Sequence, residues 1–344
     1  MAKSTGQFLI RIAAPCVAGA LMARAHRGDR NHFGNRSASA GPLTEVLPSA
    51  GWSRRRLIAS LGAGSLALAG AGSVRAGGPA GGGGGDSRLE AVVKLRGSLD
   101  ERPVWLWLIG KRYVVTPDGR SLPLCSVYNV SLTRWRRESP QGYGITVLEY
   151  NYNTDFDTGL WRDTLVMPLT GRAVPAPVGR AEPVVHHWSM SHQYEGTVGK
   201  AGEFSAATVA AMGADSALTI DRRIHGPEAL GDEVSFVQDW FLRIRPAVPA
   251  PGRRGWWVRE VATVRGSLRD VEDPSVLYAE SRTSYAITYA FQPWMQLDDQ
   301  EGWVVTAGIG GKTDDRDKVP ESILRILAAR NPEALGDPRR LLGP

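Results

Sequence analysis

Alternating hydrophobic and polar positions dominate the chain beyond residue 100 and predict β-strands. Val, Ile, Trp and Tyr recur at every second position between clusters of Gly, Pro, Asn and Asp, which is typical of half-buried strands. The run Val104–Leu108, a turn at Gly110-Lys111 and the run Tyr113–Val115 predict a hairpin. The other predicted strands are Ile145–Tyr152, Thr164–Pro168, Val184–Tyr194, Ser216–Ile220, Val234–Ile244, Trp256–Val264, Ser284–Phe291 and Trp303–Ala307. Their spacing favours an antiparallel sheet.

Helical periodicity is confined to short segments. The clearest helix begins near Val319 and ends at Arg330, with an apolar face that includes Ile323 and Leu327, and Asn331-Pro332 stops it. Leu89–Leu95 and Phe204–Met212 predict two further short helices. The fold class is therefore mainly β: a single antiparallel β-barrel or sandwich domain with a C-terminal amphipathic helix.

The region before residue 77 has a different composition and predicts an export signal. Arg54 and Arg55 follow a serine and precede an uncharged run, Leu57–Ser73, which ends at small residues around Ala76. A basic segment, an apolar segment and an A-x-A-like cleavage site in this order are typical of a signal peptide. The paired arginines resemble a twin-arginine (Tat) signal, so transient recognition by the twin-arginine export machinery is expected.

The export signal sets the expected domain organisation. Residues 1–76 form the N-terminal extension and signal peptide, 77–86 a glycine-rich flexible tether, and 87–344 a single β-rich domain. The segment 1–52 is either an unusually long leader or lies upstream of a true start near Val46, and the second interpretation is favoured. After cleavage at Ala76 no membrane span is expected, because the run Leu57–Ser73 is shorter and more glycine-rich than a bilayer requires. The expected location is periplasmic or secreted.

Charge and cysteine content exclude several classes. Residues 1–76 hold ten of the 41 Lys and Arg and two of the 35 Asp and Glu. The remaining 31 basic and 33 acidic residues leave the later part nearly neutral, so the basic character does not indicate a nucleic-acid-binding surface. The chain has two Cys, too few for a disulfide scaffold or a cysteine-ligated cluster. Cys125 lies in an apolar stretch and is expected to be buried.

Several segments of the later part resemble a known bacterial family. They are Leu95–Trp105 with Trp107 and Gly110, Tyr152–Gly159 with Trp161 and Pro168–Gly171, and Phe291–Met295 with Gly310–Lys312 and the terminal helix. Together they resemble the family catalogued as domain of unknown function 1838. The resemblance covers most of residues 93–335 and implies an exported protein of the same fold. It implies no particular activity.

Candidate catalytic residues come from two polar segments. His186, His187 and His192 fall within seven residues, and on one straight strand His186 and His192 would share a face about 20 Å apart. Asp155 and Asp157 lie in an Asp-x-Asp turn and are their natural partners, as acid–base groups or as ligands of a metal whose identity stays open. The alternatives are hydrogen-bonding strand histidines and a plain Asx-turn.

Nucleotide cofactors are not indicated. Gly310-Gly311-Lys312-Thr313 resembles the end of a phosphate-binding loop, but Thr306 stands where the first glycine is required and acidic residues follow. No dinucleotide fingerprint is present either. The cofactor, if there is one, stays unknown.

Tryptophans supply the candidate ligand-binding groups. Most must be core residues, but in a barrel some can line an apolar cup for a small molecule. The candidates are Trp105, Trp107, Trp161, Trp188 and Trp294. The favoured function is binding of a hydrophobic or aromatic small molecule in a cup of the β-scaffold. The alternative is a His- and Asp-dependent periplasmic enzyme, with or without a metal ion, acting on such a molecule, and a structural protein of the envelope ranks last.

Overall fold

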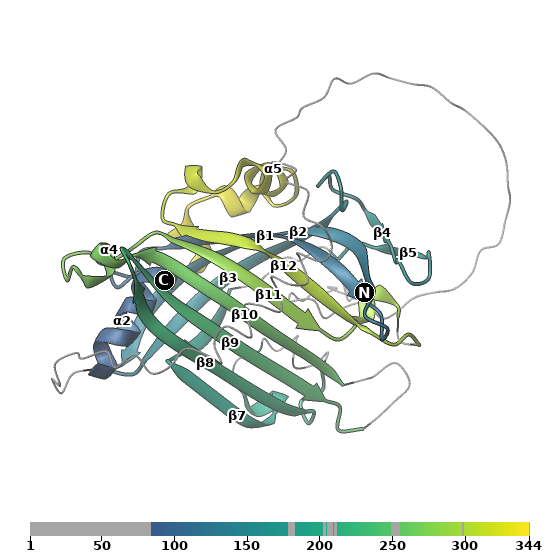
Figure 1. Cartoon of the computed structure of the whole chain (residues 1–344), viewed down its shortest axis with the longest axis horizontal. Coiled ribbons are helices and arrows are strands. Elements are labelled where there is room, and N and C mark those ends of the chain that lie inside the picture. The colour runs from purple at the N-terminus through teal and green to yellow at the C-terminus, as the bar shows by residue number, and fades with distance from the viewer. Residues whose placement is uncertain are drawn as a thin grey trace, which may run out of the picture. The chain divides into compact units, whose positions relative to one another are not determined.

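Ten strands form one antiparallel sheet in a computed structural model (Figure 1). The structure describes residues 84–343, apart from 178–182, 202–203, 205–208, 210–211, 249–254 and 298. The predicted signal residues Arg54, Arg55 and Ala76 lie outside the described residues, as do residues 77–83 of the predicted tether and most of the predicted helix Phe204–Met212. The described residues belong to one compact unit.

The strands follow one another around the sheet in a simple order. They are β1 (Val104–Val115), β2 (Ser121–Ser139), β3 (Gly142–Thr154), β6 (Val184–Trp188), β7 (Ser191–Thr197), β8 (Ala217–Leu230), β9 (Glu233–Arg245), β10 (Trp256–Ser267), β11 (Ser281–Tyr289) and β12 (Trp303–Thr313). The sheet order is β6-β3-β2-β1-β12-β11-β10-β9-β8-β7. Neighbours in the chain are therefore mostly neighbours in the sheet, which tight turns such as the one at Gly231 (φ +68°) make possible.

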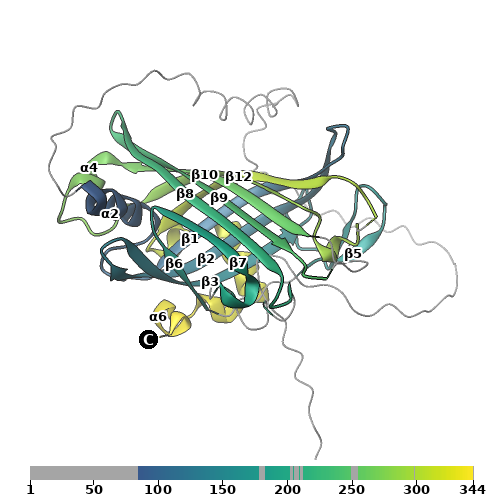
Figure 2. The same cartoon turned by 90° about the horizontal axis from the view of Figure 1, so that it is seen from below.

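The sheet curves into a nearly closed barrel. In Figures 1 and 2, strands β1, β2 and β3 lie opposite β8, β9 and β10. The two end strands, β6 and β7, are separated in the chain only by Ser189 and Met190. Arg222 of β8 links the two sides of the gap, because its guanidinium donates to the His187 carbonyl of β6 at 2.7 Å. The Ile224 N–H donates to the Met190 carbonyl at 2.9 Å, which extends the pairing of β8 from β7 into the connection. The predicted choice between barrel and sandwich is thus resolved in favour of the barrel.

The inner face of the barrel carries two separate apolar clusters. The first cluster joins residues near one end of the strands, among them Val114, Ile220 and Val258. The second joins residues near the other end, among them Trp135 and Val264. Because side chains alternate across a strand, residues at even steps from these lie on the same inner face.

Other elements cover the two ends of the barrel. Helix α2 (Gly84–Arg96) places Leu89, Val92 and Leu95 in the second cluster, beside the short helix α4 (Leu268–Glu272). The hairpin of β4 (Thr164–Val166) and β5 (Ala173–Pro175) joins the first cluster with the 3-10 turns η2 (Val198–Lys200) and η3 (Pro293–Met295). Both ends of the interior are therefore lined by apolar side chains.

The outer face of β1, β2 and β3 carries a third apolar cluster under the C-terminal helices. Helix α5 (Glu321–Arg330) buries Ile323 and Leu327 there, with the turn η5 (Pro332–Leu335) and helix α6 (Pro338–Leu342). The turn η4 (Arg316–Lys318) leads into this region. The predicted C-terminal helix is confirmed, including its end at Arg330, although it is a small element of the fold.

The local structure differs from the sequence-based expectations in several places. The predicted hairpin is one continuous strand, β1, in which Gly110 pairs with both Val127 and Gly308. Gly110 is required there for close approach, because a side chain would overlap the Tyr285 hydroxyl. The predicted strand Val184–Tyr194 bends at Ser189 and Met190 into β6 and β7. Strand β2 was not predicted, and α2 begins at Gly84, inside the expected tether.

Candidate functional site

A band of polar side chains crosses the inner face of the barrel between the two apolar clusters. On β10, for example, Glu260 stands between Val258 of the first cluster and Val264 of the second. We call this band the polar belt; it comprises Arg112, Asn129, Glu149, Asn151, Arg222, Gln238, Glu260, Tyr285 and Thr306. Arg96, the last residue of α2, reaches it from one end, as its electrostatic interaction with Glu260 shows.

Glu149 is the most firmly held carboxyl group of the belt. Asn129 and Asn151 each donate a side-chain N–H to its Oε1 at 2.5 Å. Burial raises the pKa of Glu149, and the two amide hydrogen bonds oppose that rise because they stabilise the carboxylate. Its second oxygen receives no hydrogen bond from the described residues.

Glu260 is held more loosely and lies within electrostatic reach of Glu149. Gln238 donates to its Oε1 at 3.3 Å. Burial raises the pKa of Glu260; Arg96 opposes the rise, and repulsion from Glu149 adds to it. Two carboxyl groups in one enclosed space disfavour simultaneous ionisation. The pair therefore holds a proton more readily than two separate glutamates would.

Polar atoms of the inner face remain without partners among the described residues. They are Arg96 Nε, Thr133 Oγ1, Trp135 Nε1, Gln238 Oε1, Trp256 Nε1 and Tyr285 Oη, each buried and without a hydrogen-bond partner. Such a group costs about 1–3 kcal/mol relative to its hydrated state, and more if it is charged. Of these residues, Gln238 hydrogen-bonds Glu260, and Arg96 and Tyr285 interact with the Glu260 carboxyl group electrostatically.

Two other arginines of the belt are anchored by protein groups. Arg112 is 5% exposed; it donates to Thr306 Oγ1 at 3.1 Å and to Asn153 Oδ1, and lies over the Tyr289 ring. Arg222 lies over the Trp188 ring at 5.3 Å. These contacts of the two guanidinium groups link strands on the inside of the barrel.

Cys125 and Lys312 have structural positions on the same face. The predicted burial of Cys125 is confirmed, and its Sγ lies 3.6 Å from Asn153 Oδ1. Lys312 belongs to β12 rather than to a loop, and its ammonium donates to the carbonyls of Lys94 (2.5 Å) and Gly97 (2.7 Å). These bonds fix β12 to the end of α2. Burial lowers the pKa of Lys312, and the charge of Arg96 lowers it further.

The three candidate histidines occupy different environments. His186 lies on the inner face of β6 opposite Ile145, and burial, with Arg222, lowers its pKa to about 4. His192 pairs with Arg222 across β7 and β8, so the bend after Trp188 places His186 and His192 on either side of Arg222. His187 is exposed on the outer face, where its Nδ1 lies 2.7 Å from Glu138 Oε2.

The structure does not bring the candidate aspartates to these histidines. Asp155 follows the last residue of β3, ten residues from Ile145, which corresponds to about 33 Å along a strand. Its Oδ1 accepts the N–H groups of Asp157 (3.2 Å) and Thr158 (2.9 Å), as in an Asx-turn. These hydrogen bonds lower the pKa of Asp155, the bond from Thr158 most, while Asp157 is exposed.

Three of the five candidate tryptophans lie on the outer face. Trp105 and Trp107 pack under α5 in the third cluster. Trp161 joins the same cluster, with its ring edge-on to Tyr152 and the Arg330 guanidinium 4.4 Å from its ring centre. They support the terminal helices and do not line the interior.

The other two candidate tryptophans lie within the apolar clusters at the ends of the barrel. Trp188 is 7% exposed on the inner face and packs edge-on against Trp135, with ring centres 5.0 Å apart. Trp294 belongs to the first cluster, and its Nε1 donates to Gln292 Oε1 at 2.5 Å. Trp240 and Trp256, on the inner faces of the adjacent strands β9 and β10, were not singled out from the sequence.

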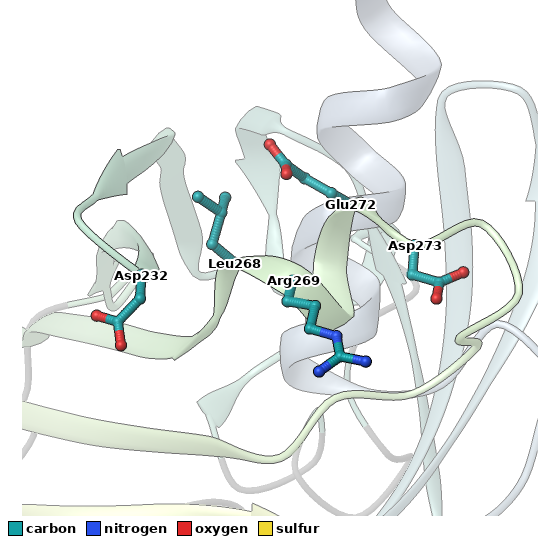
Figure 3. A pocket seen from close by; sticks show the side chains of 5 residues that line it. All are labelled: Asp232, Leu268, Arg269, Glu272 and Asp273. Carbon is teal, nitrogen blue, oxygen red and sulfur yellow. The ribbon is translucent and has the colours of Figure 1, made fainter.

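A pocket of about 550 Å³ lies outside the barrel, at the turn between β8 and β9 and along α4 (Figure 3). Asp232, Leu268, Arg269, Glu272 and Asp273 line it. Solvent can hydrate these carboxylates, so nothing in this pocket requires a ligand, unlike the unpartnered atoms of the belt. Within the described part of the chain, no group of three or more His, Cys, Asp or Glu is arranged to hold a metal ion.

The sequence does contain an indication of the polar belt. In β8, β9 and β10 one inner-face position breaks an otherwise apolar alternation: Arg222 between Ile220 and Ile224, Gln238 after Phe236, and Glu260 after Val258. A charged residue on the apolar face of a strand is expected to be buried. That exception is a stronger indication of a site than the clustered histidines.

Comparisons with known proteins add no family to this description. Neither the protein-family models nor the curated proteins contain a match to the chain. Over the described residues, no helix combines the length and apolar character that crossing a bilayer requires. The candidate site is therefore defined by its own geometry: a polar belt enclosed between two apolar clusters.

Proposed function

We propose that the chain binds a small molecule with an apolar body and a polar group inside its barrel. The observation that carries this proposal is the set of unpartnered polar atoms of Arg96, Gln238 and Tyr285, three residues that each interact with Glu260. Small-molecule sites are typically apolar enclosures with a few convergent polar groups. The belt supplies the polar groups and the flanking clusters supply the apolar walls.

The enzyme alternative lacks the arrangement on which it depended. His186 of β6 lies beside Ile145, near the start of β3, whereas Asp155 follows the last residue of β3. The Asp155 carboxylate accepts hydrogen bonds within its own turn. The proposed site therefore uses neither aspartate, and no reaction is proposed.

Calorimetric titration of the full chain with a neutral aryl ligand, 2-naphthalenemethanol, tests the proposal. We expect saturable binding to wild type and binding about tenfold weaker in Gln238→Met, since one hydrogen bond of about 1.4 kcal/mol corresponds to tenfold. Gln193→Met is the matched control, because Gln193 is exposed on β7. Equal affinity in both variants, or no binding to wild type, would contradict a site at the belt.

We also propose that the chain is exported through the twin-arginine pathway, as its resemblance to domain of unknown function 1838 implies. The support is the arrangement of Arg54, Arg55 and Ala76. Mass spectrometry of protein recovered from the periplasm of an exporting host is expected to show a chain that begins at Gly77. Arg54→Lys with Arg55→Lys should leave the precursor in the cytoplasm, and unchanged export of that variant would refute the assignment.

A further inference from the structure

Arg96 is a partly buried cation that no described residue pairs. The two residues before it fix its backbone position: Leu95 is buried in the second cluster, and the Lys94 ammonium donates to the carbonyls of Val271 (2.8 Å) and Asp273 (2.7 Å). Yet Arg96 Nε is buried without a partner, and the guanidinium makes no hydrogen bond to any described residue. Burial lowers its pKa, which reflects the cost of the charge in this place.

The protein groups nearest to Arg96 do not supply the missing anion. Glu260 interacts with Arg96 electrostatically, but no ion pair closer than 4.0 Å forms between them. Glu260 is also the carboxyl group whose proton is favoured by burial and by Glu149. On the other side, the Lys312 ammonium repels Arg96.

The charged groups of the interior also favour an anionic ligand. Among the described residues, the inner face of the strands together with Arg96 carries the guanidinium groups of Arg96, Arg112 and Arg222 and the amino group of Lys312, whose pKa burial lowers. It carries two carboxyl groups, Glu149 and Glu260, of raised pKa. An enclosed excess of positive charge favours an anionic ligand.

The side chains near Glu260 also indicate that the rest of the ligand is aromatic. The Tyr285 hydroxyl, also without a partner, lies close to Gly110 of β1 and interacts electrostatically with Glu260. Two tryptophans of the inner face stand near Glu260: Trp240 lies directly opposite it on β9, and Trp256 precedes it by four residues on β10. Flat aromatic surfaces near an unpaired guanidinium suit an aromatic ring that carries a carboxylate, because Arg binds carboxylates with two parallel hydrogen bonds.

Building on the proposed small-molecule site, we infer that its ligand is an aryl carboxylic acid whose carboxylate binds the Arg96 guanidinium. The aromatic body packs against the apolar inner face.

The test compares two probes that differ only in the charged group, 2-naphthoate and 2-naphthalenemethanol, titrated into the full chain at pH 7. Charge-assisted hydrogen bonds predict that naphthoate binds about ten- to hundredfold more tightly. Arg96→Met should abolish this preference, because it weakens binding of naphthoate far more than binding of the alcohol, whereas Arg96→Lys should keep part of the preference. Arg265→Met, on the exposed outer face of β10, is the matched control and should change neither affinity.

A second variant tests the inference without removing Arg96. Glu260→Gln removes a competing carboxyl group and should strengthen naphthoate binding severalfold, while a cation-binding site would predict the opposite. If both probes bind wild type equally, the carboxylate inference is refuted and the small-molecule site stands. If neither binds, both proposals fail, and tighter binding of 2-naphthylmethylamine than of naphthoate would also overturn the inference.

Discussion

Replacing His186 with Gln is expected to reduce the loss of stability of the protein in mild acid. In the folded chain burial, reinforced by Arg222, lowers the pKa of His186 from 6.5 to about 4. The unfolded chain therefore binds a proton on this side chain at pH values where the folded chain does not. Stability then falls as the pH decreases from about 6.5 to about 4, and it is regained as the pH rises.

The size of the effect follows from the two pKa values. Over the whole window, the difference between 6.5 and about 4 corresponds to about 3 kcal/mol of unfolding free energy. About 2 kcal/mol of this is lost between pH 7 and pH 5, where the unfolded imidazole becomes protonated and the folded one stays neutral. For a domain of this size, that loss lowers the melting temperature by roughly 4–8 °C.

Urea unfolding of wild type and His186→Gln at pH 5, 6 and 7 measures the effect. Glutamine does not titrate, so the stability of wild type relative to the variant should fall by about 2 kcal/mol from pH 7 to pH 5. The carboxyl groups of Glu149 and Glu260 titrate in both proteins and cancel in this difference. His187→Gln, at an exposed site, is the control. A difference that is independent of pH, or one that grows in acid, would refute the burial argument.

Two further substitutions test the packing of the barrel. Gly110→Ala should destabilise the chain by about 1–3 kcal/mol, because the new methyl group overlaps the Tyr285 hydroxyl and the Ala307 carbonyl. Gly142→Ala, whose nearest neighbour is Ser139 Oγ at 3.3 Å, should cost less in the same melting experiment, and an equal cost would contradict the close approach. Ile323→Ala, at a fully buried position on the inward face of α5, should cost about 2–5 kcal/mol in urea unfolding, against a smaller cost for the partly buried Ile326→Ala; the reverse order would argue against this packing.

Much of the fold could be predicted because strand alternation is a local property. The runs that became β3, β9, β10 and β11 were identified with bounds that differ by up to three residues, whereas β8 and β12 extend ten and six residues beyond the predicted runs. The errors arose where a tertiary contact overrode a local sequence preference. Gly110 is a turn former by composition, yet it lies in mid-strand because the Tyr285 hydroxyl occupies its missing side-chain position.

The candidate site was harder to predict, because alternation shows which residues share a face but not which faces meet across a barrel. His186 and Asp155 were predicted to act together because of their residue types, yet His186 of β6 lies beside the start of β3 and Asp155 follows its end. Glu149 and Glu260 are 111 residues apart in the chain and come within electrostatic reach only because the sheet closes on itself. Arg96 joins them from a helix at the barrel end.

The polar belt is difficult to explain as a device for folding. Buried ionisable groups lose hydration that their partners only partly restore, and replacing them with apolar residues is often neutral or stabilising. The clusters on either side of the belt show that this inner face accommodates apolar packing on the same strands. Arg96, Gln238 and Tyr285 therefore impose a cost that the folded chain alone does not recover. A bound polar group that completes their hydrogen bonds would recover it, and this supports a ligand at the belt more strongly than the aromatic content of the chain does.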